Sequence, residues 1–154
     1  MYKHILVAVD DSDTSKSALY EAIKLTKVHQ PATLRIIHVV DEYLDTQAAL
    51  FFDPKTFDKS LLKLGQKVLD QMQGIARKEG IEVESRLLEI KTSRYKVAEK
   101  IVEEAKTWPA DVLVLGTHGR RGFHHFLLGS VAEGVIRIAP MPVLLIRGKE
   151  AFKS

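Results

Sequence analysis

The sequence has no cysteine and no long apolar run, and each absence excludes whole classes of protein. Without thiols the chain can form neither a disulfide framework nor a thiolate metal site, and it has no cysteine nucleophile. Its longest apolar stretches, such as 5–9 and 48–52, are far shorter than the roughly 20 residues that a membrane-spanning helix needs. The first ten residues also lack the basic start, apolar stretch and cleavage site of a secretory signal. We therefore expect a cytoplasmic protein that does not enter a membrane.

Positive charge is in slight excess but is not concentrated. The 154 residues carry a formal net charge of +3, with 45% hydrophobic and 28% charged residues. Such a composition is typical of one compact domain, so we expect residues 1–154 to form a single domain with a sizeable core. A nucleic-acid partner would need lysine and arginine gathered on one face, and only 118–125 forms a local cationic cluster. Nucleic acid is therefore not an expected partner.

Short apolar runs alternate with longer segments of helical period, a pattern that indicates repeated βαβ units and a parallel sheet. The expected strands are His4–Asp10, Leu34–Val40, Glu82–Ile90, Asp111–Leu115 and Val143–Arg147. The expected helices cover Thr14–Val28, Lys59–Lys78, Ser93–Thr107 and Ser130–Ala139. The segment 41–57 has no clean period and is expected to be a loop or a short helix. The sequence predicts an α/β fold, with one doubly wound parallel sheet of five strands in the order 3-2-1-4-5, flanked by about four helices.

The third of these strands alternates polar and apolar side chains more than the others do. Alternation of this kind is typical of a strand at the edge of a sheet, so 82–90 is expected at one edge. The winding of such a sheet reverses beside its first strand, and ligands bind there, outside the carboxyl ends of the strands. The loops that begin at Asp10 and Gly116 would flank this point.

The loop after the fourth strand contains the clearest candidate for a binding site. It reads Gly116-Thr117-His118-Gly119, then nine further residues, then Gly129-Ser130 at the start of the last helix. Glycines let the backbone approach a phosphate closely, and the first N–H groups of a helix can bind an anion. The side chains of Arg120 and Arg121 could neutralise the outer phosphates.

The residues alone leave a second interpretation open, in which the glycines serve only turns and Ser130 caps a helix. Two common phosphate motifs are absent, because no Gly-Lys-Ser/Thr ending is present and acidic residues replace G-x-G-x-x-G after the first strand. This argues against P-loop nucleoside triphosphatases and Rossmann dehydrogenases. Asp10 and Asp11 could hold Mg²⁺ against phosphates, although capping explains Asp11 equally well. No structural metal site is expected from the histidines of 118–125, which lack a third spaced ligand.

The glycine spacing after a buried strand resembles the ATP-binding signature of the universal stress protein family. The similarity extends to the opening strand and acidic turn at 5–12, the end of the second strand at 38–41 and the closing strand at 140–146. Only 41–57 and the tail have no clear counterpart. The family has members with this glycine pattern, which bind ATP, and members without it, which do not. The sequence resembles the ATP-binding branch.

The resemblance implies a place for each part of ATP. Asp10 and Val39 would meet the adenine, and Leu115 and Gly116 would lie near the ribose. The phosphates would be held by Gly119, Gly129, Ser130 and Val131. Ala8 stands where some ATP-binding relatives have proline.

Three classes of function remain. The first is an ATP-binding stress-response regulatory or signalling module, a homodimer through the strand 143–146, whose contacts with an unidentified protein partner change with ATP occupancy. The second is a slow ATPase or a phosphotransferase, for which the sequence offers no evident base and no second-substrate pocket. The third is a nucleotide-free, chaperone-like dimer. We adopt the first as the working hypothesis.

Overall fold

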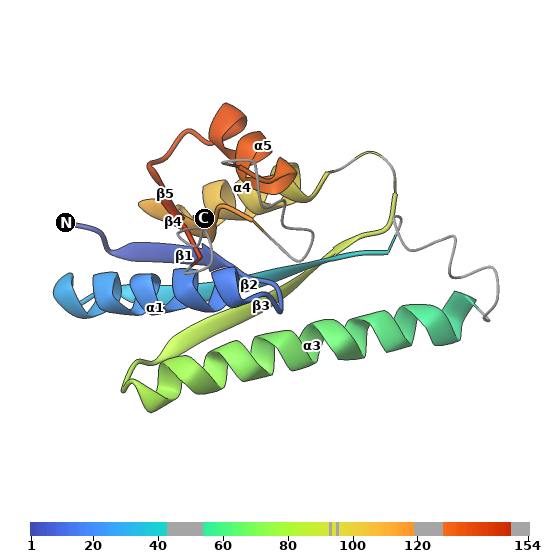
Figure 1. Cartoon of the computed structure of the whole chain (residues 1–154), viewed down its shortest axis with the longest axis horizontal. Coiled ribbons are helices and arrows are strands. Elements are labelled where there is room, and N and C mark those ends of the chain that lie inside the picture. The colour runs from blue at the N-terminus through green and yellow to red at the C-terminus, as the bar shows by residue number, and fades with distance from the viewer. Residues whose placement is uncertain (43–53, 93, 95, 119–127, 149–154) are drawn as a thin grey trace.

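The fold is a parallel sheet between two layers of helices (Figure 1). The computed structural model describes residues 1–42, 54–92, 94, 96–118 and 128–148, with the backbone alone described for 54–58. The strands of this described part are β1 His4–Ala8, β2 Thr33–Asp41, β3 Val83–Ile90, β4 Val112–Gly116 and β5 Val143–Ile146. The helices are α1 Asp13–Val28, α3 Pro54–Lys78, α4 Val97–Thr107 and α5 Ser130–Ile138. The strand order is β3-β2-β1-β4-β5, and all neighbours are parallel. The predicted class, strand order and edge position of the third strand are confirmed.

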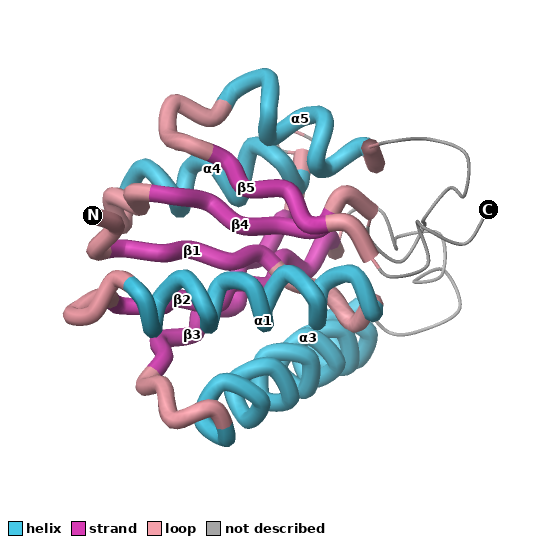
Figure 2. The backbone as a smooth tube through the Cα atoms, turned by 60° about the vertical axis from the view of Figure 1, so that its left-hand side comes forward, coloured by secondary structure: helices cyan, strands magenta, loops and turns pink. Residues whose placement is uncertain are grey.

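Each face of the sheet has its own apolar core. Helices α1 and α3 cover one face, and α4 and α5 cover the other (Figure 2). In β1, Ile5 and Val7 face the first core while Leu6 faces the second, and all three are fully buried. A strand that is buried on both faces reads as a continuous apolar run, which is why β1 could be recognised from sequence.

Two helices begin several residues away from the expected position, whereas α1 and α5 begin within one residue of it. The helix α3 starts at Pro54 instead of Lys59, so the last residues of 41–57 are helical and the expectation of a loop or short helix there is wrong for them. Proline suits the first position of a helix, where its missing N–H would have no partner. The helix α4 starts at Val97 instead of Ser93. Its apolar stripe begins at Val97, and most of the stability of a helix in a protein comes from packing of such a stripe.

The 25-residue helix α3 lies very close to the sheet at Gly65. A Cβ atom added there would lie 2.6 Å from Val40 Cγ2 and 3.0 Å from Leu87 Cδ1. Glycine therefore sets how near α3 can lie to β2 and β3. None of the described helices, α3 included, is long and apolar enough to cross a membrane.

The amino ends of β1 and β4 are joined by Asp111. Its Oδ2 accepts hydrogen bonds from the N–H groups of Lys3 and His4 at 2.7 and 2.8 Å. These backbone donors favour the charged carboxylate and lower the pKa of Asp111 from its ordinary value. This contact lies at the amino ends of the strands, opposite to their carboxyl ends.

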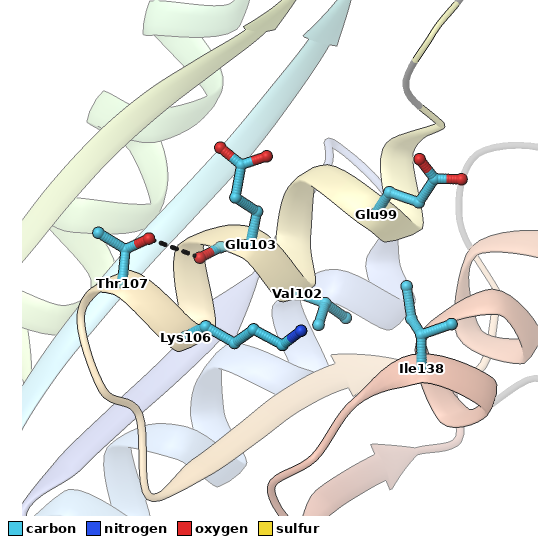
Figure 3. Close-up of a pocket in the computed structure, with 6 residues that line it drawn as sticks. All are labelled: Glu99, Val102, Glu103, Lys106, Thr107 and Ile138. Carbon is cyan, nitrogen blue, oxygen red and sulfur yellow. Dashed lines mark hydrogen bonds between the residues drawn. The ribbon is translucent and has the colours of Figure 1, made fainter.

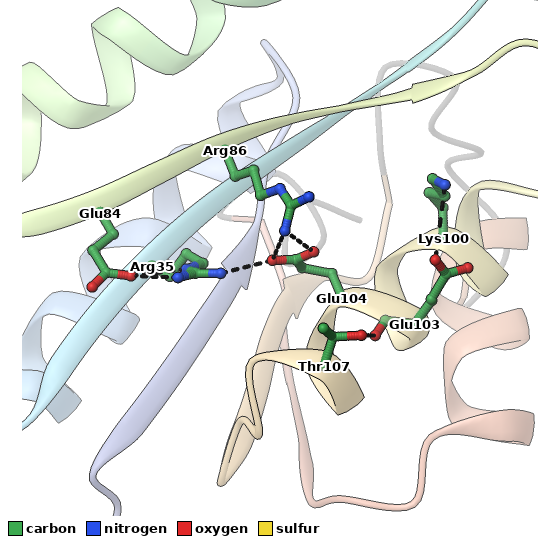
Figure 4. A network of polar contacts seen from close by, with 7 residues as sticks. All are labelled: Arg35, Glu84, Arg86, Lys100, Glu103, Glu104 and Thr107. Carbon is green, nitrogen blue, oxygen red and sulfur yellow. Dashed lines mark hydrogen bonds and ion pairs between the residues drawn. The ribbon is translucent and has the colours of Figure 1, made fainter.

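A charged network attaches α4 to β2 and β3 (Figure 4). The carboxylate of Glu104, only 6% exposed, contacts Arg35 at 2.8 Å and Arg86 at 3.0 Å. Arg35 also pairs with Glu84 at 2.7 Å, and its guanidinium carbon lies 4.6 Å from the centroid of the Trp108 ring. Every charge in this network has an opposite charge beside it, as burial requires.

We predict that Glu104→Ala lowers the free energy of unfolding by about 1 to 3 kcal/mol, because both arginines lose a charged hydrogen-bond acceptor. The adjacent Glu103, 55% exposed and 4.0 Å from Lys100, provides the control. Glu103→Ala is expected to change stability by less than about 0.5 kcal/mol. Urea unfolding measures both. Equal effects of the two substitutions would contradict a structural role for the buried carboxylate.

Candidate functional site

The carboxyl ends of β1, β2 and β4 lie side by side. We call this end of the sheet its carboxyl edge, as distinct from the outer strands β3 and β5. The strand β1 is flanked by β2 on one side and β4 on the other, so the loops that follow these strands open beside one another. Three of the predicted site residues, Asp10, Val39 and Gly116, therefore lie at the same edge. The candidate site is built from the segments after β1 and β4.

After β1 the chain forms a compact hydrogen-bonded turn, which we call the Asp10 turn and which comprises Asp10, Ser12 and Ser15. Asp10 Oδ1 accepts from the N–H of Ser12 at 2.8 Å and from the hydroxyl of Ser15 at 2.9 Å. The N–H of Asp10 donates to Ser15 Oγ at 2.8 Å, and the N–H of Ser15 donates to Ser12 Oγ at 3.1 Å. Ser12 is thereby the N-cap of α1. The turn holds the Asp10 carboxylate at the start of that helix.

The start of α1 also packs directly against the ends of β4 and β5. A Cβ atom on Gly116 would lie 2.5 Å from Thr14 Cγ2, and one on Gly148 would lie 2.6 Å from Thr14 Oγ1. Thr14 thus occupies a notch that exists because both neighbours are glycines. We call this contact the Thr14 notch.

The start of α5 is attached to the end of β4. Thr117, which is 4% exposed, donates its N–H to the carbonyl of Ile146 at 2.9 Å and accepts from the N–H of Gly129 at 2.6 Å. Gly129 has a φ of −76°, so positive φ is not the reason for glycine there. A Cβ atom on Gly129 would lie 3.2 Å from the carbonyl oxygen of Thr117, which makes this close approach the reason.

The first turn of α5 presents backbone donors at this edge. The first hydrogen bond within the helix runs from the N–H of Glu133 to the carbonyl of Gly129 at 3.0 Å. The N–H groups of 130–132 have no acceptor within the helix, as at the start of any α-helix. Ser130 is exposed and adds a hydroxyl, and the helix dipole is positive at this end. The arrangement can bind an anion.

The remaining predicted site residues differ in what they can offer. Leu115 is 3% exposed with its side chain in the core under α4 and α5, so only its backbone could meet a ligand. Val39 and Val131 are half-buried against the same core. Gly119, Arg120 and Arg121 lie outside the described residues.

His38 is a packed and hydrogen-bonded residue at the end of β2. Its Nδ1 donates to the carbonyl of Val9 at 2.7 Å, since a carbonyl oxygen can only accept. The bond ties the end of β2 to the segment that leads into the Asp10 turn. His38 thus has a structural partner.

Four residues at this edge were not among the predicted site residues, namely Ser12, Thr14, Ser15 and Thr117. One local signal was present, because Ser12 and Ser15 have the spacing of an N-cap and the third helical residue. No local pattern of this kind indicates the contacts of Thr14 and Thr117, because the residues they contact belong to other segments of the chain.

The donor set at this edge fits Mg²⁺ only as a partner of phosphates. Among the described residues, no three histidine, aspartate or glutamate side chains gather as metal ligands. Mg²⁺ usually takes one or two carboxylates together with phosphate oxygens and water. The carboxylate of Asp10 could serve in that way, whereas the described residues form no cage for a cation held by protein side chains alone.

Two pockets of the described residues lie away from this edge. One, of about 340 Å³, lies between α4 and α5 and is lined by Glu99, Val102, Glu103, Lys106, Thr107 and Ile138 (Figure 3). The other, of about 630 Å³, lies at the amino ends of β2 and β3, with Lys27, Gln30 and Glu82 among its lining residues. Neither is lined by the segments after β1, β2 or β4, so neither belongs to the candidate site.

Comparison with known proteins identifies the family. The sequence model of the universal stress protein family matches residues 1–147. The chain belongs to the universal stress protein family. Among curated members, universal stress protein MJ0531 of Methanocaldococcus jannaschii is 33% identical over 147 residues, which are 96% of this chain and 83% of that protein.

Solved structures of similar proteins have the same universal stress protein fold. The hypothetical protein MJ0577 is 26% identical, with a TM-score of 0.81 over 97% of this chain and 98% of that one. The universal stress protein from Archaeoglobus fulgidus, solved in complex with dAMP, is 25% identical, with a TM-score of 0.71 over 94% and 98%. An adenine nucleotide is thus bound by at least one structural relative.

We predict that Gly116→Ala destabilises the protein by about 1 to 3 kcal/mol, because the new methyl group overlaps Thr14 and forces the start of α1 outward. The clash is with Thr14 Cγ2, so the same change should cost less in a Thr14→Ala background. Thermal and urea unfolding of the four proteins of this cycle measure the coupling.

Gly74→Ala is the control for the glycine substitution itself. An added Cβ atom at Gly74, which lies within α3, meets no atom within 4 Å. Alanine is the better helix former, so this variant should gain about 0.5 to 1 kcal/mol. Additive effects of Gly116→Ala and Thr14→Ala would show that the notch does not constrain the fold.

Proposed function

We propose that this universal stress protein binds ATP at the carboxyl edge of its sheet and acts as a stress-response regulatory or signalling module. The observation that carries the proposal is the start of α5, where three backbone N–H groups and the Ser130 hydroxyl open next to the end of β4. The G-x-x-G spacing before Gly129-Ser130 supports a phosphate ligand. The relative solved with dAMP supports an adenine nucleotide as its class.

In this proposal the phosphates lie at the positive end of α5. Ser130 and Val131 donate from the helix start, while Gly129 keeps that start close to β4. The adenine lies by Asp10 and Val39, and the ribose lies by Leu115 and Gly116. The loop after β4 would add Gly119, Arg120 and Arg121. Mg²⁺ that accompanies ATP would be held mainly by phosphate oxygens and water, with at most one or two carboxylates from the acidic turn after β1.

We predict that Ser130→Ala weakens ATP binding roughly 10- to 150-fold, since a hydrogen bond to a charged group is worth about 1.5 to 3 kcal/mol and about 1.4 kcal/mol is one decade of affinity. Gly129→Val should weaken it further, because its side chain would push Thr117 away from the start of α5. Isothermal titration calorimetry with ATP and excess Mg²⁺ measures both.

Thr107→Ala is a matched control for removal of a hydroxyl. Thr107 donates to the carbonyl of Glu103 at 2.9 Å within α4 and has no place in the proposed site. Its variant should bind ATP as wild type does. Equal binding by wild type, Ser130→Ala and Gly129→Val, or no binding at all, would refute the phosphate site. ATP turnover by wild type would favour a slow ATPase over a signalling module.

We also propose that the protein is a homodimer through the outer edge of β5. This strand is last in the sheet, and apolar side chains are exposed on it and on the neighbouring helix. Leu144 is 38% exposed, and Ile136 and Ile138 on α5 are each 45% exposed. A second copy of β5, running antiparallel, would pair the open edge symmetrically.

The backbone of β5 indicates how to test this edge. The carbonyls of Pro142 and Ile146 accept bonds from the N–H groups of Leu113 and Thr117, at the β4 side. Alternate residues of a strand direct their backbone groups to the same neighbour, so those of Leu144 also face β4. A proline at 144 could not donate a backbone hydrogen bond to β4, so it would damage the sheet as well as the interface. A side-chain substitution at 144 tests the interface alone.

We predict that Leu144→Lys weakens dimerisation roughly 10- to 150-fold. Burial of a leucine is worth about 1.5 to 3 kcal/mol, and a lysine opposes edge pairing. Leu64→Lys on α3, where the leucine is 59% exposed and lies outside the proposed interface, is the control and should leave the dimer intact. Analytical ultracentrifugation across a concentration series measures both variants. A monomeric wild type at micromolar concentration would refute the proposal.

A further inference from the structure

The first turn of α1 does not follow the usual capping pattern. In a capping box, the side chain at the third helical position reaches back to the N–H of the N-cap residue, and it is normally Glu or Gln. Here the third position is Ser15, and the N–H of the N-cap Ser12 donates to Asp10 Oδ1 at 2.8 Å. Because Asp10 satisfies this N–H, the cap does not require the hydroxyl of Ser15.

The hydroxyl of Ser15 instead makes both of its hydrogen bonds to Asp10. It accepts from the N–H of Asp10 at 2.8 Å and donates to Asp10 Oδ1 at 2.9 Å. Ser15 is 5% exposed, so water competes little for these bonds. A buried group that bonds to the backbone and the carboxylate of one residue holds the two in a single relative orientation.

We infer that Ser15 is a positioning residue for nucleotide binding, an inference that rests on the function proposed above. Its hydroxyl and the N–H of Ser12 both hold Oδ1, so the Asp10 carboxylate cannot turn about its terminal torsion. A carboxylate only accepts hydrogen bonds, and a fixed one selects ligands that present an N–H or O–H group at that point. The base amine and the ribose hydroxyls of an adenine nucleotide are such donors.

The expected gain in affinity arises because the Asp10 carboxylate is already ordered before the ligand binds. Ordering one side chain on binding costs about 0.5 to 1.5 kcal/mol, which corresponds to about 2- to 12-fold in affinity. Ser15→Ala would remove one of the two bonds on Oδ1 and loosen the carboxylate, which returns part of that cost to the binding step. The start of α1 would keep its N-cap, because the N–H of Ser12 donates to Asp10 Oδ1 and Ser12 Oγ accepts from the N–H of Ser15, and neither bond uses the hydroxyl of Ser15.

A double-mutant cycle on the full chain tests this assignment, with ATP as the ligand and calorimetry as the readout. Ser15→Ala is expected to weaken ATP binding about 2- to 12-fold. In an Asp10→Ala background the same change should have no further effect, because Ser15 is inferred to act on the ligand only through the Asp10 carboxylate. Ser15→Cys, which fills the same space with a much weaker hydrogen-bonding group, should weaken binding in the same direction.

Ser17→Ala is the control on the same helix. Its hydroxyl donates to the carbonyl of Asp13 at 3.3 Å, and the variant should bind ATP as wild type does. Thermal melts establish that each variant is folded. Equal losses from Ser15→Ala in both backgrounds, or wild-type affinity in Ser15→Cys, would mean that Ser15 acts through packing and would overturn the inference.

These results separate the inference from the proposed function. If Ser130→Ala weakens ATP binding while Ser15→Ala does not, the nucleotide site stands and the role of Ser15 falls. A wild-type protein that binds no ATP overturns both.

Discussion

Burial of both faces of the parallel sheet is the constraint on which the rest of the structure depends. The central residues of β1, Ile5 to Val7, are enclosed between two helix layers, and their backbone groups are bonded to β2 and β4. A strand in that position has no room for a polar side chain without a partner. Polar chemistry is therefore displaced to the ends of the strands. Asp111 occupies the amino end and Asp10 the carboxyl end.

Close approach through glycine organises the carboxyl end. Gly116 and Gly148 make room for Thr14, and Gly129 makes room for the carbonyl of Thr117. Of the residues described, only Gly80 has a positive φ. Thus Gly116, Gly129 and Gly148 are needed for lack of a side chain and not for an unusual backbone conformation. Packing and ligand binding are compatible explanations, because the contacts that need glycine also bring the start of α5 to β4.

Two carboxylates illustrate how the surroundings decide what an acidic residue does. The side chain of Glu104, on the buried face of α4, lies between two arginines, where its charge is neutralised and its role is to join the helix to the sheet. Asp10 lies at the end of β1, where a backbone N–H and a hydroxyl hold its Oδ1 in position. A fixed acceptor at a strand end is suited to recognising a ligand donor. Neither role could be assigned from residue type.

Local patterns in the chain were sufficient for the class, the number of strands and the start of α5 at Ser130, because hydrophobic period and cap residues act over a few neighbouring positions. The strand order was predicted from the topology rules of doubly wound sheets. These rules also placed Asp10 and Gly116 at one edge. The start of α3 at Pro54 was missed, since the preceding residues show no helical period. The notch around Thr14, the bond from Thr117 to Gly129 and the enclosure of Ser15 were decided only by the tertiary structure. Each depends on the distance between segments that come together only when the helices pack on the sheet. Such distances cannot be predicted from the local sequence pattern.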